Sequence, residues 1–244
     1  MISIENLNKD RQIKSQQSLF DIGPKMKNYL AETSFIDYSN TEIKEISNTI
    51  YSPNTSDTDN AIALYLYVRD TIKYDPYSLT PNTSCFTASE ILKAGKGYCV
   101  SKAILLTALL RSINIPARLG FADVVNHLSS KKLLERMGTN IFYYHGYVEV
   151  FLNDRWVIAT PAFDSNLCEI AGIPPLEFDG KNDSKFQKFN DAGNQYMEYL
   201  NEHGSFPDAP YDLLLEKYAH YYPALVKSDS EASSGDLHLE MGSE

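Results

Sequence analysis

The longest apolar segment of the chain runs from Cys99 to Ile113, and its side chains are apolar around almost the whole helical wheel. A surface helix carries an apolar stripe on one face only, so this pattern predicts a helix buried on most of its surface. Asn114 ends the expected helix, and Pro116 prevents its continuation because proline lacks the backbone N–H that a helix interior needs. We therefore expect residues 99–113 to form the central core helix.

Two later segments, 141–152 and 155–160, are dominated by aromatic and β-branched residues. Such residues favour strands, and the pair Asn153-Asp154 between the segments suits a two-residue hairpin turn. The sequence therefore predicts an antiparallel hairpin.

Three other helices follow from weaker patterns. An apolar stripe over 62–74 predicts a helix that Asp75-Pro76 ends, and the turn-forming loop 52–60 supplies its N-cap residues. Residues 87–90, Thr-Ala-Ser-Glu, form a possible capping box for a short helix ahead of Gly95. Residues 211–222 suit a last helix.

The other segments are less strongly patterned. We expect an irregular arm or short strand over 1–25, two short helices within 26–51, a strand over 117–125, a polar loop with a helical turn over 126–140, polar loops over 176–210 and disorder beyond Lys227.

Composition and charge exclude several classes of protein. The chain has 244 residues, 43% of them hydrophobic, and a formal net charge of −10. No apolar run approaches the roughly 18 residues that a membrane span needs, and the N-terminus lacks the apolar centre of a signal peptide, so we expect a cytoplasmic protein without a membrane span. An acidic chain without clustered Lys and Arg disfavours nucleic-acid binding. The oligomeric state stays open.

The three cysteines, Cys85, Cys99 and Cys168, are widely spaced and include no CxxC pair. This spacing argues against a disulfide framework and against structural zinc. His203, His220 and His238 show no metal-ligand spacing either, so we predict no metal and no cofactor.

Cys99 stands where the glycine-rich turn Gly95-Lys96-Gly97 meets the core helix. Unpaired N–H groups and the positive end of the helix dipole favour a thiolate there, and Lys102 adds a cation about one turn away. Cys99 is therefore a candidate nucleophile, although a small buried hydrophobic side chain would give the same pattern.

A nucleophilic cysteine also needs a base and a group that orients the base. His145 stands near the start of the first hairpin strand, and Asp164 follows the second. Together with Cys99 they form an ordered Cys, His, Asp set, which predicts a catalytic triad.

Three blocks of the chain carry a family resemblance. GYCVSKAILLTALLRSINIPAR from Gly97, HGYVEVFLNDRWVIATP from His145 and YVRDTIKYD from Tyr67 resemble the signature blocks and entry helix of the transglutaminase-like superfamily, whose fold is related to papain-like cysteine proteases. The resemblance covers roughly residues 58–165. It implies an α+β fold in which a nucleophile helix packs on an antiparallel sheet. It also implies a catalytic domain over 58–225, between an N-terminal arm with helices (1–57) and a flexible acidic tail (226–244).

The resemblance further implies acyl transfer through a Cys99 thioester, with a protein or peptide substrate whose carboxamide is often a glutamine side chain. An imidazolium at His145 would protonate the leaving amine. An entering amine gives transglutamination, and water gives deamidation or proteolysis; the sequence does not separate these outcomes. A catalytically silent protein-binding module on the same fold is the alternative.

The sequence departs from the family at Thr160-Pro161, where the family usually has an aspartate before the proline. Either Asp164 or Thr160 could supply the third member of the triad. The N–H of Cys99 is the natural first oxyanion donor, and Tyr98 or a residue near Cys85 is a candidate for the second.

Two further side chains and the tail have possible roles. His127 could line the cleft, and Asp123 could bind a donor amine or a basic group of the substrate, although structural roles are the default for both. The acidic, serine-rich C-terminus is similar in composition to secretion signals of some bacterial effectors, but a solvated end is the simpler interpretation.

Overall fold

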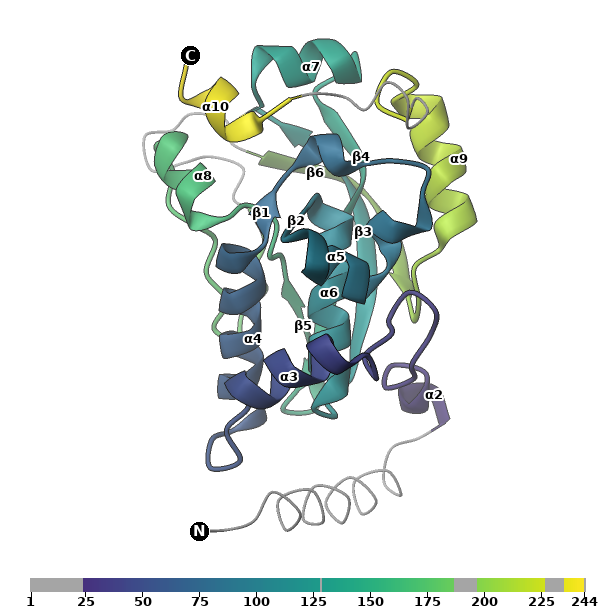
Figure 1. The fold of residues 1–244 in the computed structure, drawn as a ribbon, viewed down its shortest axis with the longest axis vertical. Helices are drawn as coiled ribbons and strands as arrows, with labels where there is room; N and C mark the ends of the chain where they lie inside the picture. The colour runs from purple at the N-terminus through teal and green to yellow at the C-terminus, as the bar shows by residue number, and fades with distance from the viewer. Residues whose placement is uncertain (1–23, 128, 187–196, 227–234, 244) are drawn as a thin grey trace.

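The computed structural model describes residues 24–127, 129–186, 197–226 and 235–243 (Figure 1). The expected arm over 1–25 lies almost entirely outside the described residues. The described helices are α2 (Pro24–Lys27), α3 (Thr41–Ile50), α4 (Asp57–Thr71), α5 (Ala88–Ala94), α6 (Cys99–Ser112), α7 (Lys131–Met137), α8 (Ser165–Ile170), α9 (Tyr211–Tyr221) and α10 (Leu237–Met241), with 3₁₀ turns η1 (Pro76–Ser78) and η2 (Thr83–Phe86).

The strands form two sheets. A short parallel pair joins β1 (Lys73–Tyr74) to β2 (Lys96–Gly97), and an antiparallel sheet has the order β5-β4-β3-β6, with strands β3 (Ala117–Asn126), β4 (Ile141–Leu152), β5 (Arg155–Ala159) and β6 (Met197–Phe206). The α+β class with an antiparallel sheet is confirmed.

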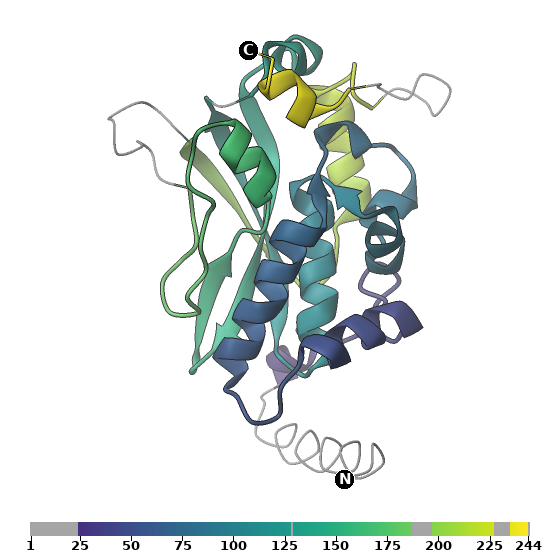
Figure 2. The same cartoon turned by 60° about the vertical axis from the view of Figure 1, so that its left-hand side comes forward.

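Helix α6 is the centre of the molecule. It packs on β3 and β4, while α3, α4 and α5 cover its other sides, as Figures 1 and 2 show. Every residue from Cys99 to Arg111 is buried. The apolar pattern around the whole helix is therefore explained by its position between the sheet and three other helices, as predicted.

The hairpin β4–β5 is also confirmed. Asn153 and Asp154 both adopt positive φ angles, 50° and 62°, which is the backbone geometry of a type I′ turn. Short polar side chains tolerate this geometry better than others do, so the turn was predictable from the two residues.

Two local predictions are wrong. Thr87 makes no side-chain cap for α5, because its hydroxyl donates to the carbonyl of Thr83; the capping box is instead at the start of α4, between Ser56 and Asp59. The segment expected to hold only polar loops over 176–210 contains β6, whose polar residues are half exposed at the edge of the sheet.

The C-terminal residues also differ from the expected flexible tail. Residues 237–241 form α10, which packs against α8. Asp236 caps this helix and forms an ion pair with Lys73. Among the residues that the structure describes, none of the helices has both the length and the apolar character required to cross a membrane.

Candidate active site

Cys99 is the first residue of α6 and is only 7% exposed. The chain reaches it through Gly95, which ends α5 in the left-handed region at φ 64°, and then through β2. Pairing of β2 with β1 holds this approach in place. The sulfur is therefore fixed on rigid structure at a helix start, as the sequence predicted.

His145 lies on β4, next to a glycine that lets the strand approach α6. A Cβ built on Gly146 would lie 2.8 Å from the Cα of Val100. Only a residue without a side chain lets β4 come this close to the first turn of α6. This close contact brings His145, which is 2% exposed, to the same site as Cys99.

The two side chains line one cavity of about 40 Å³. A cavity of this size can hold a few water molecules. The lining residues are otherwise apolar or aromatic, without a Lys, Arg, Asp or Glu: Tyr74, Pro76, Leu79, Tyr98, Met137, Phe142, Tyr143, Tyr218, Tyr222 and Leu225. The last three, from α9 and the turn after it, form what we call the tyrosine roof (Tyr218, Tyr222, Leu225).

Burial keeps both candidate catalytic groups neutral at pH 7. It raises the pKa of Cys99 to about 11, although hydrogen bonds from the N–H groups of Gly146 and Val100 act in the other direction. Burial also lowers the pKa of His145 to about 4. The cavity is thus lined by a thiol and a neutral imidazole. The expected thiolate and imidazolium are not favoured here, because the desolvation cost exceeds the gain from the helix start.

Lys102 does not support a thiolate. Its side chain is fully buried, and its Nζ donates to the carbonyls of Arg69 and Ile72 at the end of α4. Burial lowers the pKa of Lys102 to about 7. Lys102 therefore has a structural role: its ammonium group donates hydrogen bonds to backbone carbonyls that have no partner at the end of the helix.

Asp164 is not joined to His145 in this structure. Its carboxylate accepts hydrogen bonds from the backbone N–H groups of Tyr74 and Leu167, both at 2.8 Å, and it contacts Nε2 of His238 at 3.0 Å. The predicted third member of the triad therefore makes other contacts in this structure: Asp164 is the N-cap of α8 and binds His238 of α10.

Thr160 does not replace it. Its hydroxyl donates to the carbonyl of Ser184 at 2.7 Å, and its own carbonyl accepts from Tyr65. Both ring nitrogens of His145 are buried without a hydrogen-bond partner in the described part of the chain. No described side chain therefore orients the imidazole through a hydrogen bond, although the ring of Phe186 packs edge-on against it.

Of the three remaining candidates, one lines the cavity and two do not. Tyr98 lines the cavity as the N-cap residue of α6 and stays a candidate for contact with substrate. His127 is exposed beyond the end of β3 and does not line the cavity. Asp123 is buried in the sheet and contacts His203 and the backbone of Tyr144. It does not line the cavity either.

Sequence reasoning missed the tyrosine roof and the contact between Asp164 and His238. Tyr218 and Tyr222 are four residues apart, so they share a face of α9, but nothing in the sequence indicates which element that face covers. His238 lies in the tail that was expected to be disordered.

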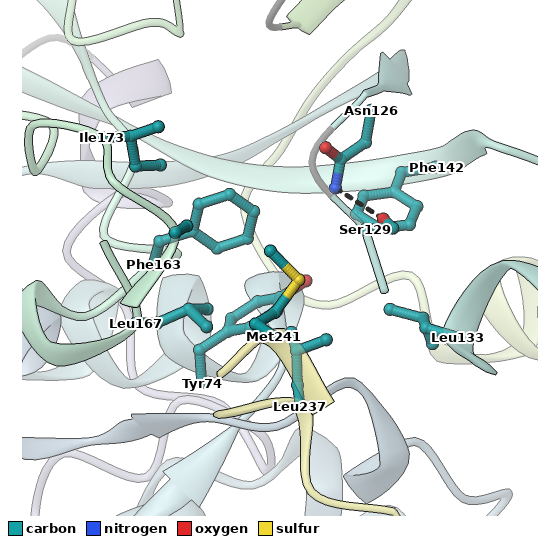
Figure 3. A pocket seen from close by; sticks show the side chains of 11 residues that line it. Tyr74, Asn126, Ser129, Leu133, Phe142, Phe163, Leu167, Ile173, Leu237 and Met241 are labelled. Atoms are coloured by element: carbon teal, nitrogen blue, oxygen red, sulfur yellow. Dashed lines mark hydrogen bonds between the residues drawn. The ribbon is translucent and has the colours of Figure 1, made fainter. Parts of the chain in front are cut away.

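A smaller cavity of about 10 Å³ lies next to the first and shares Tyr74 and Phe142 with it. Figure 3 shows Leu237 and Met241 of α10 near Tyr74, whose ring also packs against that of Phe163. The C-terminal helix therefore completes an apolar layer that supports Tyr74.

The comparison with protein families matches residues 44–161 to the transglutaminase-like superfamily. This region is a transglutaminase-like core. The matched region runs from α3 to the end of β5 and includes both Cys99 and His145. It ends before Asp164.

Two solved structures are similar to parts of this chain. A candidate cysteine protease from Cytophaga hutchinsonii is 17% identical with a TM-score of 0.46, over 59% of this chain and 44% of that one. A candidate protease from Parabacteroides distasonis is 13% identical with a TM-score of 0.36, over 56% of this chain and 25% of that one. This chain thus spans less than half the length of either. No curated protein sequence matches it.

We expect the variant Asp164→Asn to lose stability and keep the reactivity of Cys99. Hydrogen bonds, chiefly from the N–H of Tyr74 and from His238, outweigh burial and lower the pKa of Asp164, so its carboxylate stabilises the fold at neutral pH and loses this effect below about pH 4. Removing the charge should cost about 1–3 kcal/mol in urea unfolding at pH 7. Loss of Cys99 alkylation in the folded variant would contradict the capping role.

The neutral state of His145 predicts a pH dependence of stability. An unfolded histidine binds its proton near pH 6.5, whereas His145 in the fold stays neutral down to about pH 4. The unfolded state therefore binds more protons in this window, so stability is complete above pH 6.5 and falls by up to about 3 kcal/mol towards pH 4. Urea unfolding of the wild type and of His145→Gln between pH 4 and pH 7 measures how much of this pH dependence is due to His145. If the free energies of unfolding of the two proteins changed in parallel with pH, the assignment to His145 would be contradicted.

Proposed function

We propose that this protein is a thiol-dependent enzyme that transfers or hydrolyses an acyl group of a protein or peptide amide, with Cys99 as nucleophile and His145 as base. The observation that carries the proposal is the placement of a helix-start cysteine and a strand histidine on one uncharged cavity within a transglutaminase-like core.

The neutral pair fits a mechanism in which attack and proton transfer occur together. As Cys99 Sγ bonds to the carbonyl carbon, the thiol proton moves to a ring nitrogen of His145, which has no competing hydrogen bond. The N–H of Cys99 has no acceptor within the helix and is available to the developing oxyanion. The tetrahedral intermediate then expels an amine, which takes the proton from His145, and a thioester remains on Cys99.

The second step depends on what reaches the thioester. Water, deprotonated by His145, releases a carboxylic acid, and an amine gives a new amide. The tyrosine roof lines the cavity together with Cys99. Because the sulfur is buried, a substrate must displace some of the lining side chains before its carbonyl can reach it. The absence of charged side chains from this lining favours an uncharged carboxamide over a charged acyl donor.

A silent binding module is the second candidate, and one observation favours it: no described side chain makes a hydrogen bond to the imidazole of His145. Mass spectrometry distinguishes the two. The protein is incubated with glutamine-containing peptides, with and without cadaverine as amine donor. A gain of about 1 Da indicates deamidation, addition of cadaverine with loss of ammonia indicates transamidation, and shorter peptides indicate proteolysis. Unchanged peptides that still bind the protein would support the binding module.

A further inference from the structure

The sheet departs from regular pairing in the part of β3 around Asp123, once against β4 and twice against β6. On β4, the register shifts at Asp123, so that both Tyr143 and Tyr144 lie opposite it. On β6, His203 and Leu200 are left without pairing partners on β3. A bulge adds one residue to a strand and re-aims the side chains that follow it. The residue after the bulge on β4 is His145.

The backbone at this bulge is strained. Tyr144 has φ 55°, in the left-handed region that bulky residues avoid. Residues held in such regions persist only where their surroundings compensate for the strain, and they cluster at functional sites. The strain here lies in the residue directly before the candidate catalytic base.

Asp123 compensates for this strain. Its Oδ1 accepts the N–H of Tyr144 at 3.1 Å and contacts Nε2 of His203 at 2.7 Å, while Oδ2 accepts from Asn201 at 3.3 Å. The rings of Tyr144 and His203 stack with centroids 4.0 Å apart and planes 2° from parallel. The carboxylate is 4% exposed, so these three groups are its main partners.

The peptide between Tyr144 and His145 is also held from α9. The hydroxyl of Tyr218, which belongs to the tyrosine roof, donates to the carbonyl of Tyr144 at 3.3 Å. The N–H of Tyr144 and its carbonyl are thus fixed by two different elements. Because the backbone of Tyr144 is fixed, the direction in which the His145 side chain leaves the strand is set without a hydrogen bond to its ring.

We propose that Asp123 is a positioning residue for His145: it holds the Tyr144 bulge that aims the imidazole into the cavity. In a catalytic triad, a carboxylate that is hydrogen-bonded to the imidazole holds its orientation. Here the fixed backbone before His145 holds it. This inference rests on the proposed function, since it assigns to Asp123 a role in the Cys99–His145 pair. It also explains why Thr160 and Asp164 are free to serve elsewhere in the fold.

The variants Asp123→Ala and Asp123→Asn test the proposal. Asparagine can still accept the N–H of Tyr144, so it should keep kcat within a few-fold of the wild type. Alanine removes the acceptor and lets the bulge relax. We expect it to lower kcat by about 100-fold with little change in KM, as misplacement of a reacting group by about 1 Å does.

Asn60→Ala is the matched control for a general loss of stability. Asn60 is a buried polar residue on α4, and its side chain bonds to Ser52 and Ser56, not to any residue lining the cavity. It should lower the melting temperature and leave kcat unchanged. A folded Asp123→Ala protein with wild-type kcat, or an equal loss of kcat in Asn60→Ala, would overturn the positioning role.

A second measurement does not depend on turnover. The ring signal of His145 in a ¹H–¹³C NMR spectrum reports the surroundings of the imidazole. We expect this signal to move in Asp123→Ala and to stay near its wild-type position in Asp123→Asn and Asn60→Ala. An inactive wild type would count against the proposed function alone, whereas an unmoved His145 signal in folded Asp123→Ala would count against the role of Asp123.

Discussion

The variant Cys99→Ser should lose turnover by a factor of about 10³ or more while keeping its fold. Serine has nearly the same size as cysteine, so the buried site stays filled, but its hydroxyl is a far weaker nucleophile than sulfur beside a neutral imidazole. Turnover is measured with the peptide assay described above, and folding by circular dichroism and thermal unfolding.

The other two cysteines provide the control for this variant. Cys85 is half-buried, and Cys168 is buried on α8; neither lines the cavity with His145. Cys85→Ser should keep full turnover, and Cys168→Ser should change stability more than it changes turnover. Turnover that survives in Cys99→Ser would show that another group carries the chemistry.

The variant Gly146→Ala should separate β4 from the start of α6 and so reduce both stability and turnover. The added methyl group would lie 2.8 Å from the Cα and Cγ2 of Val100. The Cα belongs to the backbone of α6, so relief requires movement of the strand or the helix. Overpacking of this kind costs about 1–3 kcal/mol, and a shift of about 1 Å between His145 and Cys99 should lower kcat by about 100-fold.

Gly120→Ala is a matched control on the neighbouring strand. Its methyl group would lie 2.1 Å from the ring of Tyr147, so it should also destabilise the sheet. The clash does not involve α6. Urea unfolding and turnover of both variants separate the two effects: we expect similar losses of stability, but a large loss of kcat in Gly146→Ala alone. An equal loss of kcat in both variants would contradict the special role of Gly146.

The parts of the fold predicted from the sequence are those in which local preference and burial agree. Helix α6 is apolar on all sides because it is enclosed on all sides, and the β4–β5 turn has residues suited to its positive φ angles. Because both elements were predicted, the sequence also placed Cys99 at the start of α6 and His145 on the hairpin.

The features that the sequence did not predict concern contacts between segments far apart in the chain. Asp164 lies close in sequence to the hairpin, but it is the N-cap of α8 and binds His238, 74 residues later. Strand β6 is an edge strand of the described sheet, and His203, which its bulge leaves without a pairing partner, contacts Asp123, 80 residues earlier in the chain. Periodicity within one segment carries no information about such partners.

The burial of Cys99 has a consequence for the protein under oxidative stress. Peroxides react with the thiolate form of cysteine, and they require access to the sulfur. Cys99 is a buried residue, and burial raises the pKa of its thiol, so both access and thiolate formation are disfavoured. The same burial that a substrate must overcome therefore slows irreversible oxidation of the candidate nucleophile.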